Sequence, residues 1–267
     1  MGLAGKERLT GAEAALLEAL PRGRKIDLPA LAGAFENQIS RQYLSILLAR
    51  LVRKKRAMRL KRGVFFVPSA SGPSEYQLGL GLAKGRGAYI GFASALYLYH
   101  WIDEQPFTVF VVNSRVSRSV KKGLFEYRLV NLGEKAQGIT TVNGVDVSSP
   151  AKTVFDAFLH PEYCGGMQKV LSAFSQARLS NNDWRELLYY LEELGSACLR
   201  QRIGFAAEKL FGSKTPRFFV SRLKKAAAES KSTCFLDPSA SRKGKYSAEW
   251  KLVQNTGLPA PAEKVIV

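Results

Sequence analysis

Residues 40–67 constrain the fold more than any other part of this sequence. Ser40 is a favourable helix N-cap, and the residues after it carry an apolar stripe at helical spacing, namely Tyr43, Leu44, Leu47, Leu48 and Leu51. From residue 58 the pattern changes to strand-like alternation, which turns near Arg62-Gly63 and returns through residues 64–67. The segment therefore predicts a helix followed by a β-hairpin.

Two shorter helices are predicted before this unit. Residues 9–20 place apolar side chains at helical spacing and end at the Pro-Arg-Gly of residues 21–23. Ile26 indicates a short strand, and Asp27 is positioned to cap a brief helix over residues 28–35. Three helices followed by a basic hairpin predict a winged helix-turn-helix domain, which we place at residues 1–70.

The charge of the chain is concentrated in this predicted domain. The 267 residues carry 40 Lys and Arg against 22 Asp and Glu, a net charge of +18. Residues 1–70 hold 14 of these basic residues and 5 of the acidic ones, and residues 40–62 contain nine basic residues and no acidic one. A surface that is merely solvated normally mixes positive and negative charges, which this segment does not. A helix that lies on a membrane surface does not need a packed hairpin beside it. The pattern therefore favours double-stranded DNA as the partner.

Two roles are expected for the residues that face this partner. In a winged helix-turn-helix the third helix enters the major groove, where Arg reads guanine and Gln reads adenine. The candidates for reading bases are Arg41, Gln42 and Ser45. The candidates for contacting phosphates lie at the helix end and on the hairpin, namely Arg53, Lys54, Lys55, Arg56, Arg59, Lys61 and Arg62.

The rest of the chain predicts a linker and a larger domain. Residues 71–87 are rich in Pro, Ser and Gly; the stretch "GLGLAKGRG" lacks the ending of a nucleotide-binding loop and is interpreted as a flexible loop that could contact phosphates. Residues 88–267 then place strands at 107–112, 124–130, 233–236 and 248–254 and a hairpin turning at Asn143-Gly144. Helices are expected at 94–101, 150–159, 167–177, 183–194, 199–211 and 217–229. Clustered strands followed by clustered helices predict an α+β domain.

Several segments of this larger domain resemble the AbiEi family of antitoxins and transcriptional regulators from abortive-infection toxin–antitoxin systems. They are "GAYIGFASALYLYHWIDEQP", "DVSSPAKTVFDAFLHPEYCGG", "LRQRIGFAAEKL" and "FLDPSASRKGKYSAEWKLVQN". The resemblance implies that the N-terminal domain binds inverted repeats in its own promoter and represses its operon in phage defence. It also implies that the larger domain counters a nucleotidyltransferase toxin, with Lys152, Asp156, Glu162 and Tyr163 as candidate motif residues.

The most specific of these segments also has a purely structural interpretation. Ser149 is a suitable cap and Pro150 suits a first helical turn, while residues 154–159 form an apolar face. Asp156 lies off that face four residues after Lys152, which predicts an exposed ion pair. Packing and capping are the preferred explanation of the segment, and a toxin-directed surface is the alternative.

Two alternatives to the regulator remain open. Asp237 followed by Glu249 and Lys251 has the spacing of a metal-dependent nuclease of the PD-(D/E)xK kind, although Pro238 indicates a turn after Asp237. The second alternative is a repressor whose large domain only senses or oligomerises. We assign no catalytic residue, metal or cofactor.

The cysteines and the apolar runs indicate the cellular compartment of the protein. Cys164, Cys198 and Cys234 are widely separated and unpaired in spacing, which favours buried thiols in a reducing compartment over a disulfide framework. Residues 1–10 lack the apolar run of a secretory signal, and the uncharged run at residues 88–102 is too short to span a bilayer. We expect a cytoplasmic protein without membrane contact, a monomer or weak dimer in solution.

Overall fold

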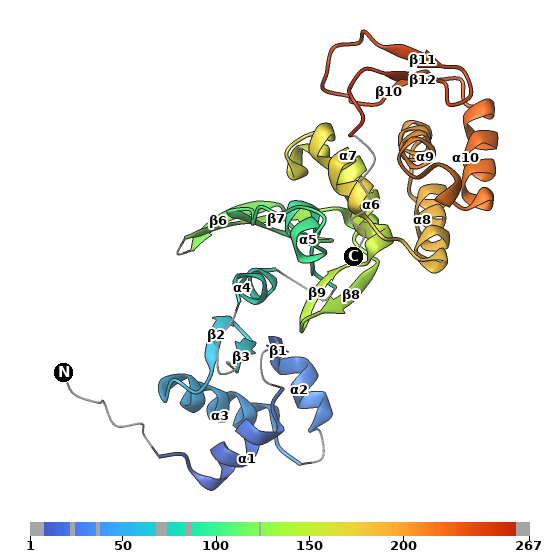
Figure 1. Ribbon diagram of the computed structural model, residues 1–267. Helices are drawn as coiled ribbons and strands as arrows, with labels where there is room; N and C mark the ends of the chain where they lie inside the picture. Colours follow the sequence, from blue (N-terminus) through green and yellow to red (C-terminus); the bar gives the residue numbers. More distant parts are fainter. Residues whose placement is uncertain are drawn as a thin grey trace, which may run out of the picture.

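The computed structural model describes residues 8–21, 25–35, 38–67, 74–83, 87–122 and 124–259, and within them the side chains of Lys25, Leu60 and Lys61 are left out. The protein is a mixed α+β molecule. Three short helices and a small sheet lie at the N-terminal end of the chain, and a larger assembly of helices and sheets follows them (Figure 1).

The N-terminal elements lie close to the positions predicted from the sequence. They are α1 (Gly11–Ala19), β1 (Lys25–Asp27), α2 (Leu28–Ala34), α3 (Arg41–Arg53), β2 (Met58–Lys61) and β3 (Val64–Phe66). The three strands form an antiparallel sheet in the order β1-β3-β2. Leucines of α1 and α3 pack against Ile26 and Phe65 of this sheet to form a core of their own. Burial of that core holds the hairpin against α3.

One member of the predicted stripe on α3 is misplaced. Leu44, Leu47, Leu48 and Leu51 are buried, but Tyr43 is 43% exposed. At 100° per residue, Tyr43 lies beyond the edge of the arc that the four leucines occupy, so it reaches solvent.

Part of the segment predicted as a linker forms a helix. This is α4 (Glu75–Leu82), capped by Ser74, whose hydroxyl accepts from the Gln77 backbone N–H at 3.3 Å. Gly79 lies against Val109, Val111 and Tyr127 so closely that a Cβ would stand only 3.0–3.2 Å from their side chains. The glycines therefore allow a helix to approach a sheet, and the interpretation of "GLGL" as a flexible, phosphate-contacting loop was wrong. Residues 84–86 of the same stretch lie outside the described residues.

A six-stranded mixed sheet forms the centre of the larger part, in the order β6-β7-β5-β4-β9-β8. Its strands are β4 (Tyr89–Ile90), β5 (Thr108–Asn113), β6 (Arg118–Lys122), β7 (Phe125–Asn131), β8 (Ile139–Val142) and β9 (Val145–Ser148). Asn143 and Gly144 both have positive φ, 49° and 76°, in the turn between β8 and β9, which confirms the predicted hairpin.

Both faces of this sheet are covered. On β5, Val109 and Val111 pack toward α4, whereas Phe110 and Val112 pack toward α5 (Phe92–Leu98) and α6 (Pro150–Leu159). A strand buried on both faces has a continuous apolar sequence, which is why "FTVFVV" carries no polar alternation.

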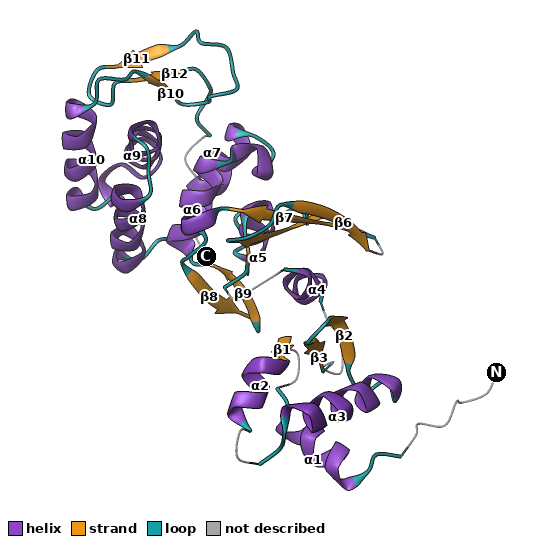
Figure 2. Cartoon of the chain, turned by 180° about the vertical axis from the view of Figure 1, so that it is seen from behind, coloured by secondary structure: helices purple, strands orange, loops and turns teal. Residues whose placement is uncertain are grey.

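The remaining helices gather at the C-terminal end, away from α1–α3, with the central sheet between (Figure 2). They are α7 (Met167–Gln176), α8 (Asn181–Glu193), α9 (Ala197–Phe211) and α10 (Arg217–Glu229), with single 3-10 turns η1 (Gly133–Lys135), η2 (Pro161–Cys164) and η3 (Gly212–Lys214). A third sheet, in the order β10-β12-β11, packs on α9; its strands are β10 (Cys234–Phe235), β11 (Lys245–Ser247) and β12 (Leu252–Gln254).

The cysteine pattern differs from the prediction. Cys198 on α9 and Cys234 on β10 are joined by a disulfide with their Cα atoms 5.5 Å apart, and Cys164 is a buried free cysteine. Cys198 and Cys234 are 36 positions apart, and the sequence gives no sign of their pairing, because it is α10 folding back along α9 that returns the chain to Cys198.

None of the helices in the described ranges is both long enough and apolar enough to cross a bilayer.

Candidate functional site

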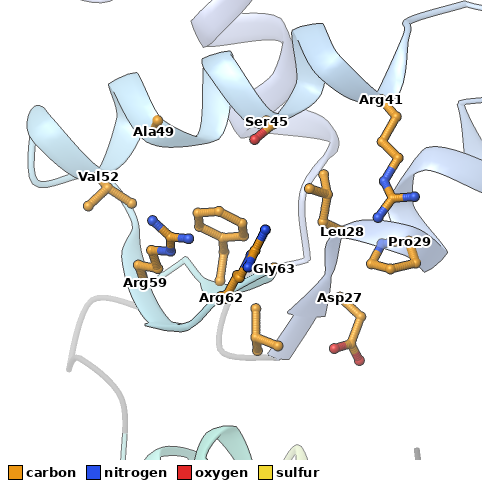
Figure 3. Close-up of a pocket in the computed structure, with 12 residues that line it drawn as sticks. Asp27, Leu28, Pro29, Arg41, Ser45, Ala49, Val52, Arg59, Arg62 and Gly63 are labelled. Atoms are coloured by element: carbon orange, nitrogen blue, oxygen red, sulfur yellow. The ribbon is translucent and has the colours of Figure 1, made fainter. Parts of the chain in front are cut away.

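A groove of about 570 Å³ lies between α3 and the β2–β3 hairpin (Figure 3). Arg41, Ser45 and Ala49 line it from α3, and Arg59 and Arg62 line it from the hairpin. Asp27, Leu28 and Pro29 close one end, so the groove carries three guanidinium groups and one carboxylate. We call it the α3 groove. It brings together two of the predicted base-reading residues and two of the predicted phosphate-contacting residues.

Local sequence explains why α3 presents this face. The Ser40 hydroxyl accepts from the Tyr43 backbone N–H at 3.2 Å and starts the helix, as predicted. The four buried leucines then fix its rotation, so Arg41, Ser45 and Ala49, four residues apart, lie on one side of the helix. Gln42 is exposed on the adjoining side and does not line the groove.

Ile46 was not singled out from the sequence, yet it is 48% exposed on α3. It follows Gln42 by one helical turn, so the two lie on the same outward side of the helix. An isoleucine in an otherwise regular apolar pattern gives no sequence signal of exposure, and only the rotation of the folded helix reveals it.

Lys54 has a different role from the one predicted for it. Its ammonium donates to Glu13 Oε2 at 2.7 Å and to the Arg8 carbonyl at 2.8 Å; the glutamate side chain is buried, and the lysine side chain is 9% exposed. The hydrogen bond from Lys54 holds the pKa of Glu13 below its ordinary value. Lys54 therefore links the end of α3 to α1, a structural role that was not predicted from the sequence.

The other predicted phosphate-contacting residues occupy the surface around the end of α3. Arg53, Lys55, Arg59 and Arg62 are exposed, and Arg56 is half-buried. Lys55 has φ of 57°, in the left-handed region, and its N–H bonds to the Val52 carbonyl at 3.0 Å, so the helix ends there. The Lys61 side chain lies outside the described residues.

The motif on α6 forms a second, buried site. Ser149 caps the helix by accepting from the Lys152 backbone N–H at 3.2 Å, as predicted. Lys152 and Asp156, however, are fully buried and form an ion pair, to which the Tyr89 hydroxyl adds a hydrogen bond at 3.0 Å to Asp156. The prediction of an exposed pair was wrong, because α6 is enclosed by the sheet on one side and by α8 on the other.

Aromatic rings surround the buried ammonium. Lys152 Nζ lies 4.9 Å from the ring centroid of Phe155, 5.8 Å from that of Tyr89 and 5.9 Å from that of Tyr190. Burial lowers the pKa of Lys152 and raises that of Asp156, while the attraction between the two charges opposes both shifts.

A glycine missed by sequence reasoning completes this site. Gly138 has φ of 78°, and its carbonyl accepts from the Ser149 N–H at 2.7 Å. A Cβ there would collide with the Tyr190 hydroxyl and with the Lys152 side chain. The Ser149 hydroxyl also donates to Glu186 on α8 at 2.7 Å, so the motif ties β4, α6 and α8 together.

Glu162 and Tyr163 lie apart from the buried pair. The Tyr163 ring contacts Phe92, with centroids 5.0 Å apart, and Arg128 stands 4.7 Å above it. Glu162 is exposed and lies 2.9 Å from His160 Nδ1. Both border an open groove of about 1,230 Å³ whose other side carries Asp103 and Glu104. The four motif candidates thus divide into a buried pair that holds the domain together and an accessible pair.

The residues of the nuclease alternative have separate partners. Glu249 accepts from Lys224 at 2.8 Å, and the ammonium of Lys251 donates to the Ala228 and Ser230 carbonyls at the end of α10. Glu249 and Lys251 lie in the turn before β12 and not on the predicted strand. Across the described ranges, no group of three or more His, Cys, Asp and Glu is placed to hold a metal ion.

Comparison with known proteins identifies a family for part of the chain and one structure of similar fold. Residues 89–205 match the family model described as the AbiEi antitoxin C-terminal domain. The crystal structure of the RV2827C protein from Mycobacterium tuberculosis is similar in fold, with a TM-score of 0.50 over 94% of each chain at 15% sequence identity. A comparison with curated proteins found no match. The resemblance predicted from the sequence is therefore confirmed over residues 89–205, which match the AbiEi antitoxin C-terminal domain.

Proposed function

We propose that this protein is an antitoxin and also a DNA-binding autoregulator, which represses its own operon through an N-terminal winged helix-turn-helix domain at residues 1–70. The order helix, strand, helix, helix and hairpin is the one such domains have, and it supports the proposal. A repressor acts where its operon is transcribed, so we place the protein in the cytoplasm. A monomer or weak dimer would pair on the two halves of an inverted repeat.

The α3 groove is the observation that carries the proposal. Arg41, Arg59 and Arg62 converge on it from two elements. Guanidinium groups bind phosphate bidentately, and a groove between a reading helix and a hairpin matches the course of one DNA strand between the major and minor grooves. With α3 in the major groove, Arg59 and Arg62 would contact the phosphates of that strand.

The residues that read bases would come from α3. Arg41, Gln42 and Ser45 lie in its first turns, and we add Ile46, whose exposed side chain could contact the methyl group of thymine. Arg53, Lys55, Arg56 and Lys61 remain proposed phosphate contacts around this helix and hairpin. Lys54 is left out because Glu13 already holds its charge.

The toxin-directed role belongs to the larger domain. The match of residues 89–205 to the AbiEi antitoxin C-terminal domain supports an antitoxin role, and we propose that the opposing toxin is a nucleotidyltransferase. Of the motif candidates, only Glu162 and Tyr163 reach the surface, so we assign toxin-directed function to the groove they share with Asp103 and Glu104. Lys152 and Asp156 would support that surface from inside.

A gel-shift titration tests the regulator. The duplex upstream of the gene should bind more tightly than a scrambled duplex of the same length and composition. Equal affinity for the two duplexes would contradict autoregulation.

A growth assay tests the antitoxin role separately. Expression of the adjacent toxin gene should arrest growth, and co-expression of this chain should restore it. An Arg59→Ala, Arg62→Ala variant expressed from a foreign promoter should restore growth equally, because it keeps the larger domain intact. Growth arrest that persists with the wild-type chain would contradict the antitoxin role, and it would favour a repressor whose large domain only senses or oligomerises.

A further inference from the structure

The third sheet carries a row of apolar side chains across its outer face. Phe235 on β10 and Tyr246 on β11 are both register partners of Val253 on β12. Register partners on neighbouring strands point to the same side of a sheet, so the three side chains lie side by side. With strands about 4.8 Å apart, the two rings stand roughly 10 Å from each other.

This face is open, whereas the opposite face belongs to the core. Cys234 and Leu252, the neighbours of the row along the strands, are buried toward α9. Tyr246 is 53% exposed, and Phe235 and Val253 are half-buried. The sheet lies at the outer end of the molecule, with α9 and α10 on its inner side (Figure 1).

Basic side chains frame the row. The segment "RKGKY" places Arg242, Lys243 and Lys245 directly before Tyr246, and all four residues are exposed. Arg242 stands over the Phe235 ring, 5.6 Å from its centroid. Residues 238–248 contain no Asp or Glu, so the charge on this edge is of one sign.

The loop that carries these residues is held in place by Asn255. Its side-chain amide donates to the Asp237 carbonyl at 2.8 Å and to the Ser241 carbonyl at 2.9 Å, and its oxygen accepts from the Asp237 N–H at 2.9 Å. At Gly244 the backbone passes so near the Gln254 carbonyl that a Cβ would collide with it. The basic segment is therefore held against β12 by contacts within the protein itself.

From this geometry we infer that the outer face of the third sheet binds single-stranded nucleic acid, with bases stacked on Tyr246 and Phe235 and phosphates paired to Arg242 and Lys243. Two aromatic rings on an open sheet face, bordered by cations, suit unpaired bases, since every base has a stacking face and every nucleotide a phosphate. A duplex hides those faces, so this site differs in ligand from the α3 groove and does not depend on it.

Fluorescence anisotropy with a labelled 12-nucleotide single strand tests the inference on the full chain. Two probes of the same sequence, one DNA and one RNA, show whether the 2′-hydroxyl contributes. Tyr246→Ala should weaken binding of at least one probe by about tenfold or more, and Tyr246→Phe should stay within about twofold because it keeps the ring. Replacing Arg242 and Lys243 together by Ala should reduce the slope of the logarithm of the association constant against the logarithm of the salt concentration by about 1.4.

Tyr189→Ala is the matched control, because Tyr189 is also 53% exposed but belongs to α8, which lies away from β11 (Figure 1). It should leave affinity for both probes unchanged. The Arg59→Ala, Arg62→Ala variant should also keep single-strand binding, even if it loses the duplex. Absence of single-strand binding by the wild type would overturn the inference. So would an equal loss from Tyr246→Ala and Tyr189→Ala, or a loss of single-strand binding when only Arg59 and Arg62 are changed.

Discussion

The ammonium of Lys152 and the carboxylate of Asp156 pair one helical turn apart inside the protein, and neither side chain has any exposed surface. The Tyr89 hydroxyl donates to the same carboxylate from the neighbouring strand. A buried ion pair of this kind need not stabilise a fold relative to apolar residues, but losing one partner leaves a charge without compensation. Within the segment that resembles the AbiEi family most specifically, Lys152 and Asp156 therefore have a structural role.

Replacing both members of this pair should cost less than the sum of the two single replacements. We expect Lys152→Met or Asp156→Leu to lower the free energy of unfolding by about 3–5 kcal/mol, and the double variant to lose less than the sum. Urea denaturation measures all three. The exposed pair Arg222–Glu192 is the control, where Arg222→Met should change the free energy of unfolding far less than either single replacement in the buried pair. Additive losses at Lys152 and Asp156 would show that the two charges are not coupled.

Gly138 should tolerate no side chain. We expect Gly138→Ala to lower the free energy of unfolding by about 2–4 kcal/mol, because a positive φ is combined with a collision against Tyr190 and Lys152. Gly144→Ala provides a matched comparison, since Gly144 has φ of 76° but nothing within 4 Å of an added Cβ. It should cost only about 1 kcal/mol. Thermal unfolding of the two variants separates the cost of the collision from the cost of placing alanine at a positive φ. Equal losses of stability in the two variants would contradict the close contact of Gly138 with Tyr190 and Lys152.

The link between Glu13 and Lys54 predicts a pH dependence of stability. The pKa of Glu13 is lowered in the folded state, so its contribution is present above its unfolded pKa, about 4.3, and is lost as the pH falls through the folded value. The difference in unfolding free energy between the wild type and Glu13→Gln should therefore be constant near pH 7 and shrink below about pH 4. Urea titrations at several pH values measure it. In a Lys54→Met background the same comparison should lose most of this dependence, and persistence there would point to another partner.

Periodicity predicted the elements whose apolar faces are complete. The helix at residues 150–159 has the bounds of α6, and Asn143-Gly144 marks the turn between β8 and β9. Periodicity failed for elements whose apolar face is incomplete. The edge strand β6 has the sequence "RSVKK" and was not predicted, and the glycine-containing helix α4 was interpreted as a loop. At the site, the pattern identified the α3 surface but misassigned Asp156. A polar residue off an apolar stripe is normally exposed, and only the enclosure of α6 by the sheet and α8 places it inside.

The disulfide gives a thiol count that distinguishes the two interpretations of the cysteines. In denaturant without reductant, a thiol reagent should detect one thiol, that of Cys164, and after reduction three. The closed loop between Cys198 and Cys234 predicts that reduction lowers stability by about 3–4 kcal/mol in the chain-entropy picture. Three reactive thiols before reduction would show that Cys198 and Cys234 are not joined in solution.

The α3 groove predicts how the base-reading and phosphate-contacting residues differ in effect. Arg41→Ala or Gln42→Ala should mainly reduce the preference for the upstream duplex over a scrambled one, because base contacts carry sequence discrimination. Competition gel shifts measure this ratio. A uniform loss on both duplexes would place these residues among the phosphate contacts.

The salt dependence of duplex binding tests the central claim most directly. In log–log form, the slope of the association constant against salt should fall by about 2 when Arg59 and Arg62 are both replaced by Ala, since each removes roughly one phosphate contact. The variant Arg178→Ala, Arg217→Ala removes the same charge from exposed positions of the larger part and should leave the slope unchanged. Affinity and slope that respond equally to both double variants would contradict a DNA-binding α3 groove.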